Sequence, residues 1–199
     1  MSDATGAKIC GLTNEADLAV AIEAGADAVG FVVGVPVDSP REISPERARE
    51  LTEAVPSFVT SVVVTMPETP ENARSLVGEV RPDALQVHGA DPETIAAIGT
   101  AVDVPLLGAI DAAGAGGTGE TGDWAAAREA VRESSVPVIL AGGLTPGNVG
   151  VAVAAVDPFA VDVASGVERR GGRKDHDAVR EFIARAAGTR TRSERTVEP

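Results

Sequence analysis

The only cysteine of this 199-residue chain lies in KICGLT (residues 8–13), where Lys8 and Ile9 lead into Cys10 and a glycine follows at once. A buried cysteine can serve as a small apolar filler of a core. A lone cysteine in an intracellular protein can also be a reactive group, because its thiolate is a base and a nucleophile. Cys10 is therefore a candidate catalytic residue, with core packing as the alternative.

Two glycine-containing turns near the carboxyl terminus have the composition of an anion site. Gly142 and Gly143 lie in AGGLTPGN (141–148), and Ser165 and Gly166 lie in FAVDVASGVE (159–168). Backbone N–H groups exposed at such turns, with a helix start behind them, bind phosphate. A tight turn is the alternative for either stretch alone, but their occurrence after two successive strands favours a phosphate site.

An arginine and a histidine add polar groups at other predicted strand ends. Arg41, in SPREIS (39–44), could hold a planar carboxylate through two parallel hydrogen bonds, or be a solvated loop residue. In LQVHG (85–89), Gln86 and His88 share one face of a strand, and we expect that face to line a barrel interior. We take His88 as a candidate for substrate binding rather than for proton transfer.

Two aspartates stand where a strand would otherwise be apolar or end. Asp162 lies inside VDVASG, and an unpaired buried carboxylate is costly, so it needs donors or must face a pocket. Asp111 ends LLGAID, where a partly shielded carboxyl group can deliver a proton. A turn aspartate is the alternative for Asp111. The sequence contains neither a Cys/His metal cluster nor a Ser-His-Asp pattern with supporting glycines, so we expect no metal.

Short apolar runs that alternate with amphipathic ones must position these residues. The predicted strands are KI (8–9), ADAVGFVV (26–33), FVTSVVV (58–64), DALQV (83–87), VPLLGAI (104–110), VPVIL (136–140) and FAVDVA (159–164). A helix is predicted after each, and several begin with Ser, Thr, Asn or Asp followed by Pro, which caps the first turn. The repeated strand–helix order predicts an α/β fold with parallel strands, in which sites form at the carboxyl ends of the strands.

The number of strands does not match a complete (β/α)8 barrel. Seven strands are found where eight are needed, and too few residues follow Ile110 for another helix and strand. The pattern predicts a TIM-barrel type in which the helix 5/strand 6 region, around 110–115, is missing or fused. We expect a single catalytic domain over 1–187 and a polar, disordered tail over 188–199.

The composition limits the class of partner. Thirty Asp and Glu against seventeen Lys and Arg give a net charge of −13, so nucleic acid is not an expected partner. The acidic balance favours a high-salt cytoplasm, with an ordinary acidic protein as the alternative. No apolar run is long enough to cross a membrane, and the start MSDATGA does not resemble a signal peptide. A cytoplasmic protein is the expectation.

Several stretches, taken in order, closely resemble the phosphoribosylanthranilate isomerase family of tryptophan biosynthesis. They are KICGLT, SPREIS, LQVHG, GAGGTGETGDW, AGGLTPGNV and VDVASGVERRGGRKDHDAV. The resemblance runs from about Lys8 to Ala187. It implies a (β/α)8 barrel without cofactor or metal. It also implies an Amadori rearrangement of N-(5-phosphoribosyl)anthranilate to 1-(2-carboxyphenylamino)-1-deoxyribulose 5-phosphate.

The resemblance also implies roles for the candidate residues. Cys10 corresponds to the family's general base, and Asp111 is the residue in a place similar to that of its general acid. Arg41 would contact the anthranilate carboxylate, and Asp162 would lie beside the anthranilate amine. The phosphate would be held by Gly142, Gly143, Ser165 and Gly166.

Two departures leave alternatives open. The helix and strand that precede the family's acid are apparently absent, and Gly122 stands where the family usually has an aromatic residue. Asp111 reaches the acid position only if one strand serves for two. The alternatives are a non-catalytic phosphosugar-binding descendant and a different phosphosugar enzyme on the same scaffold. A missing unit would also expose two strand edges, which could favour a homodimer.

Overall fold

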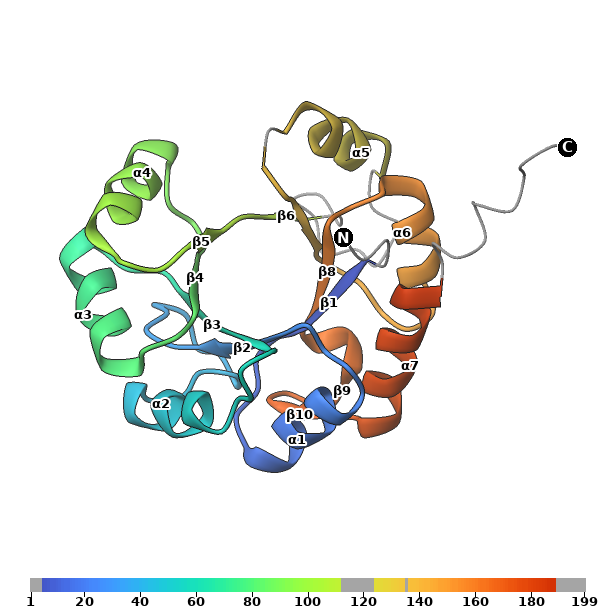
Figure 1. Ribbon diagram of the computed structural model, residues 1–199, viewed down its shortest axis with the longest axis horizontal. Helices are drawn as coiled ribbons and strands as arrows, with labels where there is room; N and C mark the ends of the chain where they lie inside the picture. Colours follow the sequence, from blue (N-terminus) through green and yellow to red (C-terminus); the bar gives the residue numbers. More distant parts are fainter. Residues whose placement is uncertain (1–4, 112–123, 135, 189–199) are drawn as a thin grey trace, which may run out of the picture.

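The predicted strands form one parallel sheet in the computed structural model, which describes residues 5–111, 124–134 and 136–188. The strands are β1 (Gly6–Ile9), β2 (Ala28–Val32), β3 (Thr60–Thr65), β4 (Ala84–Val87), β5 (Leu106–Leu107), β6 (Ala109–Asp111), β7 (Ile139–Ala141) and β8 (Ala160–Val163). Their order in the sheet is β5-β4-β3-β2-β1-β8-β7-β6. β1, the first of these strands along the chain, thus pairs with β8, the last, and the sheet curls into a ring (Figure 1). The loop over 114–123, with Gly122, and the tail from 189 onward lie outside the described residues.

Helices surround this ring (Figure 1). They are α1 (Glu15–Glu23), α2 (Pro45–Glu53), α3 (Pro70–Val80), α4 (Pro92–Ala101), α5 (Trp124–Glu133), α6 (Val149–Val156) and α7 (His176–Gly188). The predicted caps at α1 to α4 are confirmed, because Asn14, Ser44, Thr69 and Asp91 each accept a first-turn amide. After β8 the chain adds a short 3-10 turn η1 (Ser165–Val167) and the hairpin β9 (Glu168–Arg170) and β10 (Arg173–Lys174). No helix in the described ranges is long and apolar enough to cross a membrane.

The predicted fusion of the fifth and sixth strands is confirmed. The single predicted strand over 104–110 contains β5 and β6, separated only by Gly108 and with no helix between them. Leu106 and Leu107 pair with β4, whereas Ala109 to Asp111 pair with β7. One continuous segment therefore joins the two halves of the ring, and in Figure 1 it spans the side between α4 and α5.

The barrel has two distinct cores. The larger lies between strands and helices and includes Phe31, Leu51, Leu85 and Phe182, all fully buried. The smaller lies inside the ring and contains Cys10, Val62, Val64 and Ala84, with Ala28, Val32, Leu107 and Ala164 packed against it. Because side chains alternate along a strand, one set faces the helices and the other fills the barrel.

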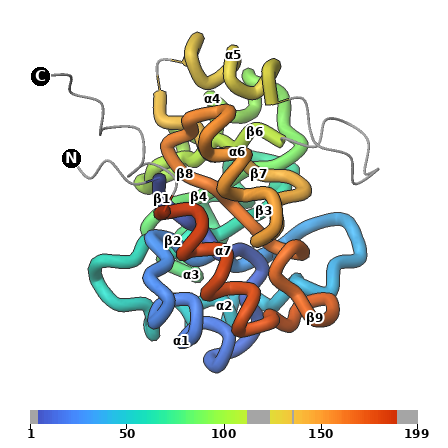
Figure 2. Tube along the Cα trace, turned by 90° about the vertical axis from the view of Figure 1, so that its right-hand side faces the viewer, coloured from blue at the N-terminus to red at the C-terminus, as the bar shows by residue number. Residues whose placement is uncertain are grey.

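Contacts between the first and last units hold the ring closed. The side view in Figure 2 shows α6 and α7 along the outside of the barrel, and α7 also packs against α1. Asp17, in the first turn of α1, is buried and accepts hydrogen bonds from the Lys174 amide (3.0 Å) and Asn14 Nδ2 (2.7 Å). Its other oxygen lies 2.9 Å from His176 Nε2 at the start of α7. Burial raises the pKa of Asp17, but these bonds lower it more, and the net shift is downward.

We expect Asp17→Ala to lower the free energy of unfolding by roughly 2–3 kcal/mol, because it leaves buried donors without an acceptor. Asp177→Ala is the matched control. The Asp177 carboxylate is 98% exposed, so its loss should cost less than about 0.5 kcal/mol. Denaturant unfolding measures both, and equal costs would contradict the structural role of Asp17.

The Asp17 contribution should also depend on pH. Because its pKa is lowered on folding, the stabilisation is complete above the unfolded value of about 4. It should be lost as pH falls through the lower folded value. The stability difference between wild type and Asp17→Asn should therefore shrink in acid.

Candidate active site

Cys10 follows directly on β1 at the carboxyl end of the barrel. Its amide donates to the Val163 carbonyl of β8 (2.8 Å), and its side chain is 7% exposed. Gly30 on β2 provides space for the thiol, since a Cβ atom there would lie 2.8 Å from Cys10 Sγ. The thiol thus points into the barrel interior.

The glycine after the cysteine has a structural reason. Gly11 has a φ of +72°, a conformation that favours glycine. A Cβ at Gly11 would also lie 2.6 Å from Arg41 Cδ. The Cys-Gly pair therefore lets Arg41, from the loop after β2, cross the chain beside the thiol.

A buried ion pair lies next to Cys10 inside the barrel. Lys8 Nζ donates to Asp162 Oδ2 (2.7 Å) and to Gln86 Oε1 (2.8 Å), and the side chains of Lys8 and Asp162 are 1% and 8% exposed. Among the described residues Asp162 Oδ1 is buried without a hydrogen-bond partner. This orphan oxygen is an available acceptor within the site.

His88 is linked to that pair through Gln86. Because Gln86 Oε1 accepts from Lys8, its amide nitrogen faces His88 and donates to Nε2 (3.3 Å). A neutral His88 must then carry its proton on Nδ1. The predicted common face of these two residues is confirmed, and His88 itself is exposed at the rim of the barrel.

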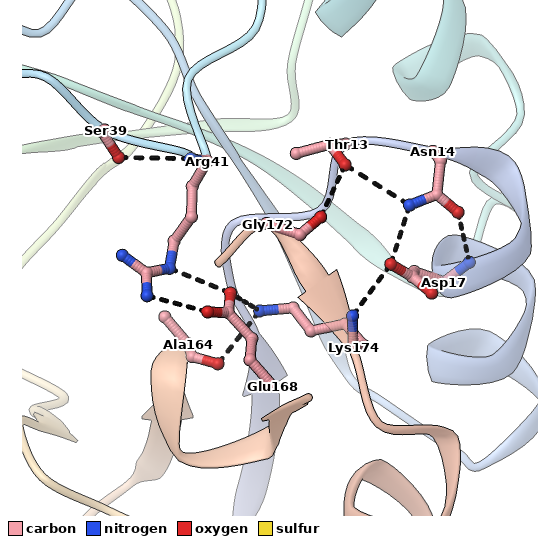
Figure 3. Close-up of polar contacts among 9 residues, drawn as sticks. All are labelled: Thr13, Asn14, Asp17, Ser39, Arg41, Ala164, Glu168, Gly172 and Lys174. Atoms are coloured by element: carbon pink, nitrogen blue, oxygen red, sulfur yellow. Dashed lines mark hydrogen bonds and ion pairs between the residues drawn. The ribbon is translucent and has the colours of Figure 1, made fainter. Parts of the chain in front are cut away.

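Arg41 is held by a second ion cluster (Figure 3). Its Nε and Nη2 donate to the two oxygens of Glu168 (2.9 and 2.8 Å), the side-on geometry that fixes a guanidinium plane. Lys174 Nζ donates to Glu168 Oε1 (2.9 Å) and to the Ala164 carbonyl (3.0 Å). The Nη1 group of Arg41 has no hydrogen-bond partner among the described residues, so it is available to a ligand.

Burial and neighbouring charges shift the pKa values of three groups in the site. Burial raises the pKa of the Cys10 thiol, and the Lys8 ammonium opposes this rise without cancelling it. Burial raises the pKa of Glu168, but hydrogen bonds from Arg41 and Lys174 lower it further than burial raises it. Burial lowers the pKa of Lys174, and its pairing with Glu168 does not fully compensate.

The two glycine turns lie against each other. Gly142 and Gly143 have positive φ values of 82° and 65°. A Cβ at Gly166 would overlap the carbonyl oxygen of Leu144, so only glycine allows the turns after β7 and β8 to pack this closely. Ser165 is exposed beside them. The arrangement gathers the four predicted phosphate residues at one place.

Asp111 ends β6 at the same end of the barrel. It is paired in register with Ala141, directly before Gly142, and is exposed. The strand order separates it from β1 by β7 and β8. Asp111 therefore reaches the mouth of the barrel from the wall beside the two glycine turns.

Comparison with known proteins identifies the family. The family model described as N-(5'phosphoribosyl)anthranilate (PRA) isomerase matches residues 7–106 and 93–185. This chain belongs to the phosphoribosylanthranilate isomerase family. The N-(5'-phosphoribosyl)anthranilate isomerase of the halophilic archaeon Haloferax volcanii is 51% identical to it, over 94% of this chain and 95% of that protein.

Solved structures agree with the sequence comparison. A phosphoribosyl anthranilate isomerase in complex with reduced 1-(o-carboxyphenylamino)-1-deoxyribulose 5-phosphate aligns with a TM-score of 0.80 and 36% identity, over 92% of this chain and 99% of that one. Monomers generated from the dimeric isomerase of Thermotoga maritima align with a TM-score of 0.72 and 33% identity, over 92% and 99% of the two chains. The predicted barrel type is confirmed.

The comparisons also locate the shortening. The two matched ranges overlap over residues 93–106, which contain most of α4 and the start of β5, so the break between the two matches lies next to the junction of β5 and β6. The Haloferax alignment spans 210 positions, but 94% of 199 residues is about 187, which leaves about 23 positions opposite gaps. That is enough for one helix and one strand, the unit absent between β5 and β6.

Sequence reasoning missed part of the site. Lys8, Glu168 and Lys174 were not among the candidates, although Lys8 pairs with Asp162, and Glu168 pairs with both Arg41 and Lys174. The one visible signal for two of them is that the chain contains only two lysines, one in each ion cluster. Charged residues in strands and hairpins are usually solvated, so the pattern alone favoured the wrong environment.

Gly30→Ala tests whether the thiol needs the space at β2. The added Cβ would lie 2.8 Å from Cys10 Sγ and 3.2 Å from its Cα, so we expect a loss of roughly 1–3 kcal/mol in unfolding free energy. The rate of Cys10 alkylation should change as well. Gly78→Ala is the control, because a Cβ there meets nothing within 4 Å and alanine favours a helix by about 0.5–1 kcal/mol. Stabilisation by both substitutions would contradict this packing.

Proposed function

We propose that this chain catalyses the isomerisation of N-(5-phosphoribosyl)anthranilate to 1-(2-carboxyphenylamino)-1-deoxyribulose 5-phosphate in tryptophan biosynthesis. The observation that carries the proposal is the arrangement at one barrel end in a chain of this family. A single thiol, an arginine with a free Nη1 and two packed glycine turns lie together there. The relative whose structure contains the reduced product has the same fold.

The substrate's charges indicate how it would bind. We assign the phosphate to the turns with Gly142, Gly143, Ser165 and Gly166, whose backbone N–H groups need no counter-ion. Arg41 is assigned to the anthranilate carboxylate, because Glu168 holds its plane and leaves Nη1 available. Asp162 Oδ1, buried without a partner, is assigned to the anthranilate N–H. His88 lines the rim.

The chemistry requires an acid and a base on opposite sides of the sugar. Asp111 would protonate the ring oxygen as the ribose opens, giving a protonated Schiff base between C1 and the anthranilate nitrogen. The Cys10 thiolate would then take the proton from C2. The electron pair of that C–H bond would form the C1–C2 double bond, and the C1–N π electrons would return to nitrogen. The enolamine would become the ketone by gaining a proton at C1 and losing the one on the C2 hydroxyl.

Loss of either proton-transfer group should abolish turnover without unfolding the chain. We expect Cys10→Ser to reduce kcat by about 10³-fold and Asp111→Asn by at least about 10²-fold, the range of general acid–base catalysis. The assay follows the loss of anthranilate-type fluorescence, with substrate generated in situ in high KCl. Asp103→Asn is the control, because that exposed aspartate precedes β5 at the opposite end of the barrel.

The outcomes separate the three readings of this fold. Turnover that collapses in Cys10→Ser supports the isomerase. Turnover that persists in Cys10→Ser would favour a different phosphosugar reaction. A folded wild-type chain that binds the product analogue without turnover would be a phosphosugar-binding relic.

We further propose a cytoplasmic homodimer. The fused segment pairs with β4 through β5 and with β7 through β6, so the unpaired edges that remain are only two and three residues long. A better reason for a dimer is apolar surface at the amino end of the barrel. Phe58, Val136 and Phe159 each precede a strand and are 102%, 66% and 63% exposed. The Thermotoga maritima relative is described as dimeric.

Sedimentation in high KCl should give the mass of two chains. Phe58→Asp should shift the equilibrium to monomer, because it places a charge where an apolar side chain would be buried. Val151→Asp, on the exposed side of α6, should leave the dimer intact. A monomeric wild type would contradict the proposal.

A further inference from the structure

The only two lysines in the chain, Lys8 and Lys174, are both about 1% exposed. Lysine is among the residues least often fully buried, so both require a local reason. Lys174 has one already, because it holds Glu168 and with it Arg41. Lys8 touches none of the groups assigned to substrate except Asp162.

Lys8 and Cys10 point into the same space. They are two residues apart along one extended segment, so their side chains leave the strand on the same face. Both converge on Gly30, where a Cβ atom would lie 2.8 Å from Cys10 Sγ and 3.2 Å from Lys8 Cε. The sulfur and that carbon are therefore no more than about 6 Å apart, the sum of these two distances.

The ammonium group of Lys8 is fixed rather than mobile. Asp162 on β8 and Gln86 on β4 accept two of its protons from two sides of the ring at 2.7 and 2.8 Å. The remaining lining near Cys10 is apolar, with Val62, Val64 and Ala84 on the facing strands. In such surroundings a nearby unit charge acts on the thiolate far more strongly than it would in water.

We propose that Lys8 is a positioning residue for this reaction, whose ammonium group, held by Asp162 and Gln86, stabilises the negative charge of the Cys10 thiolate. The inference rests on the proposed function in one respect, namely that Cys10 is the base. Lys8 transfers no proton: when the thiolate takes the C2 proton, the ammonium keeps its three and remains paired with Asp162.

The directions of the pKa shifts of Cys10 and Lys8 agree with stabilisation of the thiolate by the ammonium group. Burial raises the pKa of Cys10, and among the opposing charges Lys8 acts most strongly, ahead of Lys174; Asp162 acts with burial. Burial lowers the pKa of Lys8, but Asp162 and Cys10 together raise it above its ordinary value. Asp162 therefore both fixes the Lys8 ammonium and limits its effect on the thiol.

The chain offers a clean measurement of this thiol. It contains one cysteine and no tyrosine, so the rise in ultraviolet absorbance on alkaline titration reports Cys10 alone. Three variants are compared with wild type. They are the single variant Asp162→Asn, the double variant that combines Lys8→Met with Asp162→Asn, and Cys10→Ser, which serves as the blank. The double variant removes both members of a buried pair, which proteins generally tolerate better than the loss of one.

The decisive comparison is between the two variants that lack the carboxylate. The thiol pKa in Asp162→Asn should fall below that of wild type. In the double variant it should lie at least about one unit above that of Asp162→Asn, as expected for loss of an opposite charge at this range. Alkylation of Cys10 at fixed pH should correspondingly slow by about tenfold. Equal titrations in the two variants would overturn the proposal.

Controls separate a local effect from a general one. Removing the exposed pair Arg49–Glu53 by Arg49→Gln with Glu53→Gln should leave the titration unchanged, and an equal shift there would also overturn the proposal. If the methionine variant does not fold, Lys8→Gln with Asp162→Asn takes its place. The titration does not require turnover. Activity retained in Cys10→Ser would therefore refute the proposed function while the effect of Lys8 on the thiol is still measured.

Discussion

This structure depends on one constraint. The ring of parallel strands must close with one helix–strand unit fewer than a complete (β/α)8 barrel has. A strand has two edges, and the segment from Leu106 to Asp111 uses them in sequence. Its first part pairs with β4 and its last part with β7. The strands of a barrel are staggered relative to one another, so a single segment that advances along the barrel can meet a different neighbour at each end. Gly108, where the partner changes, has no side chain to accommodate.

This solution preserves the carboxyl end of the barrel, where the site lies. The fused segment ends at Asp111, in register with Ala141, so its carboxyl end reaches the same level as that of β7. The cost falls on the outer layer, which has one helix fewer in the described part of the chain. Leu106, which packs on the outer core, is accordingly only half-buried, whereas Leu85 on the neighbouring strand is fully buried.

How much of this could be read from the sequence depends on the range of the interaction involved. The strands and helices follow from local features such as β-branched runs and the caps at Asn14 and Ser44, and they were predicted correctly. Cys10, Arg41 and Asp162 could be found because their types are unusual where they occur. The pairing of Arg41 with Glu168 could not, since it joins residues 127 positions apart through the docking of a hairpin. Lys8 was missed for a related reason, because its partners come from strands on either side of the ring.

The site also resolves an apparent conflict between a chain of net charge −13 and an anionic substrate. Counted together, the two ion clusters contain three cations, Lys8, Arg41 and Lys174, and two carboxylates, Asp162 and Glu168, so they carry one net positive charge. At high ionic strength the field of the acidic surface falls off within about 3 Å at 1 M salt. Buried pairs are screened much less, so the local excess of positive charge persists where the surface charge does not. An acidic surface without lysines is therefore compatible with a site that keeps its positive charge inside the barrel.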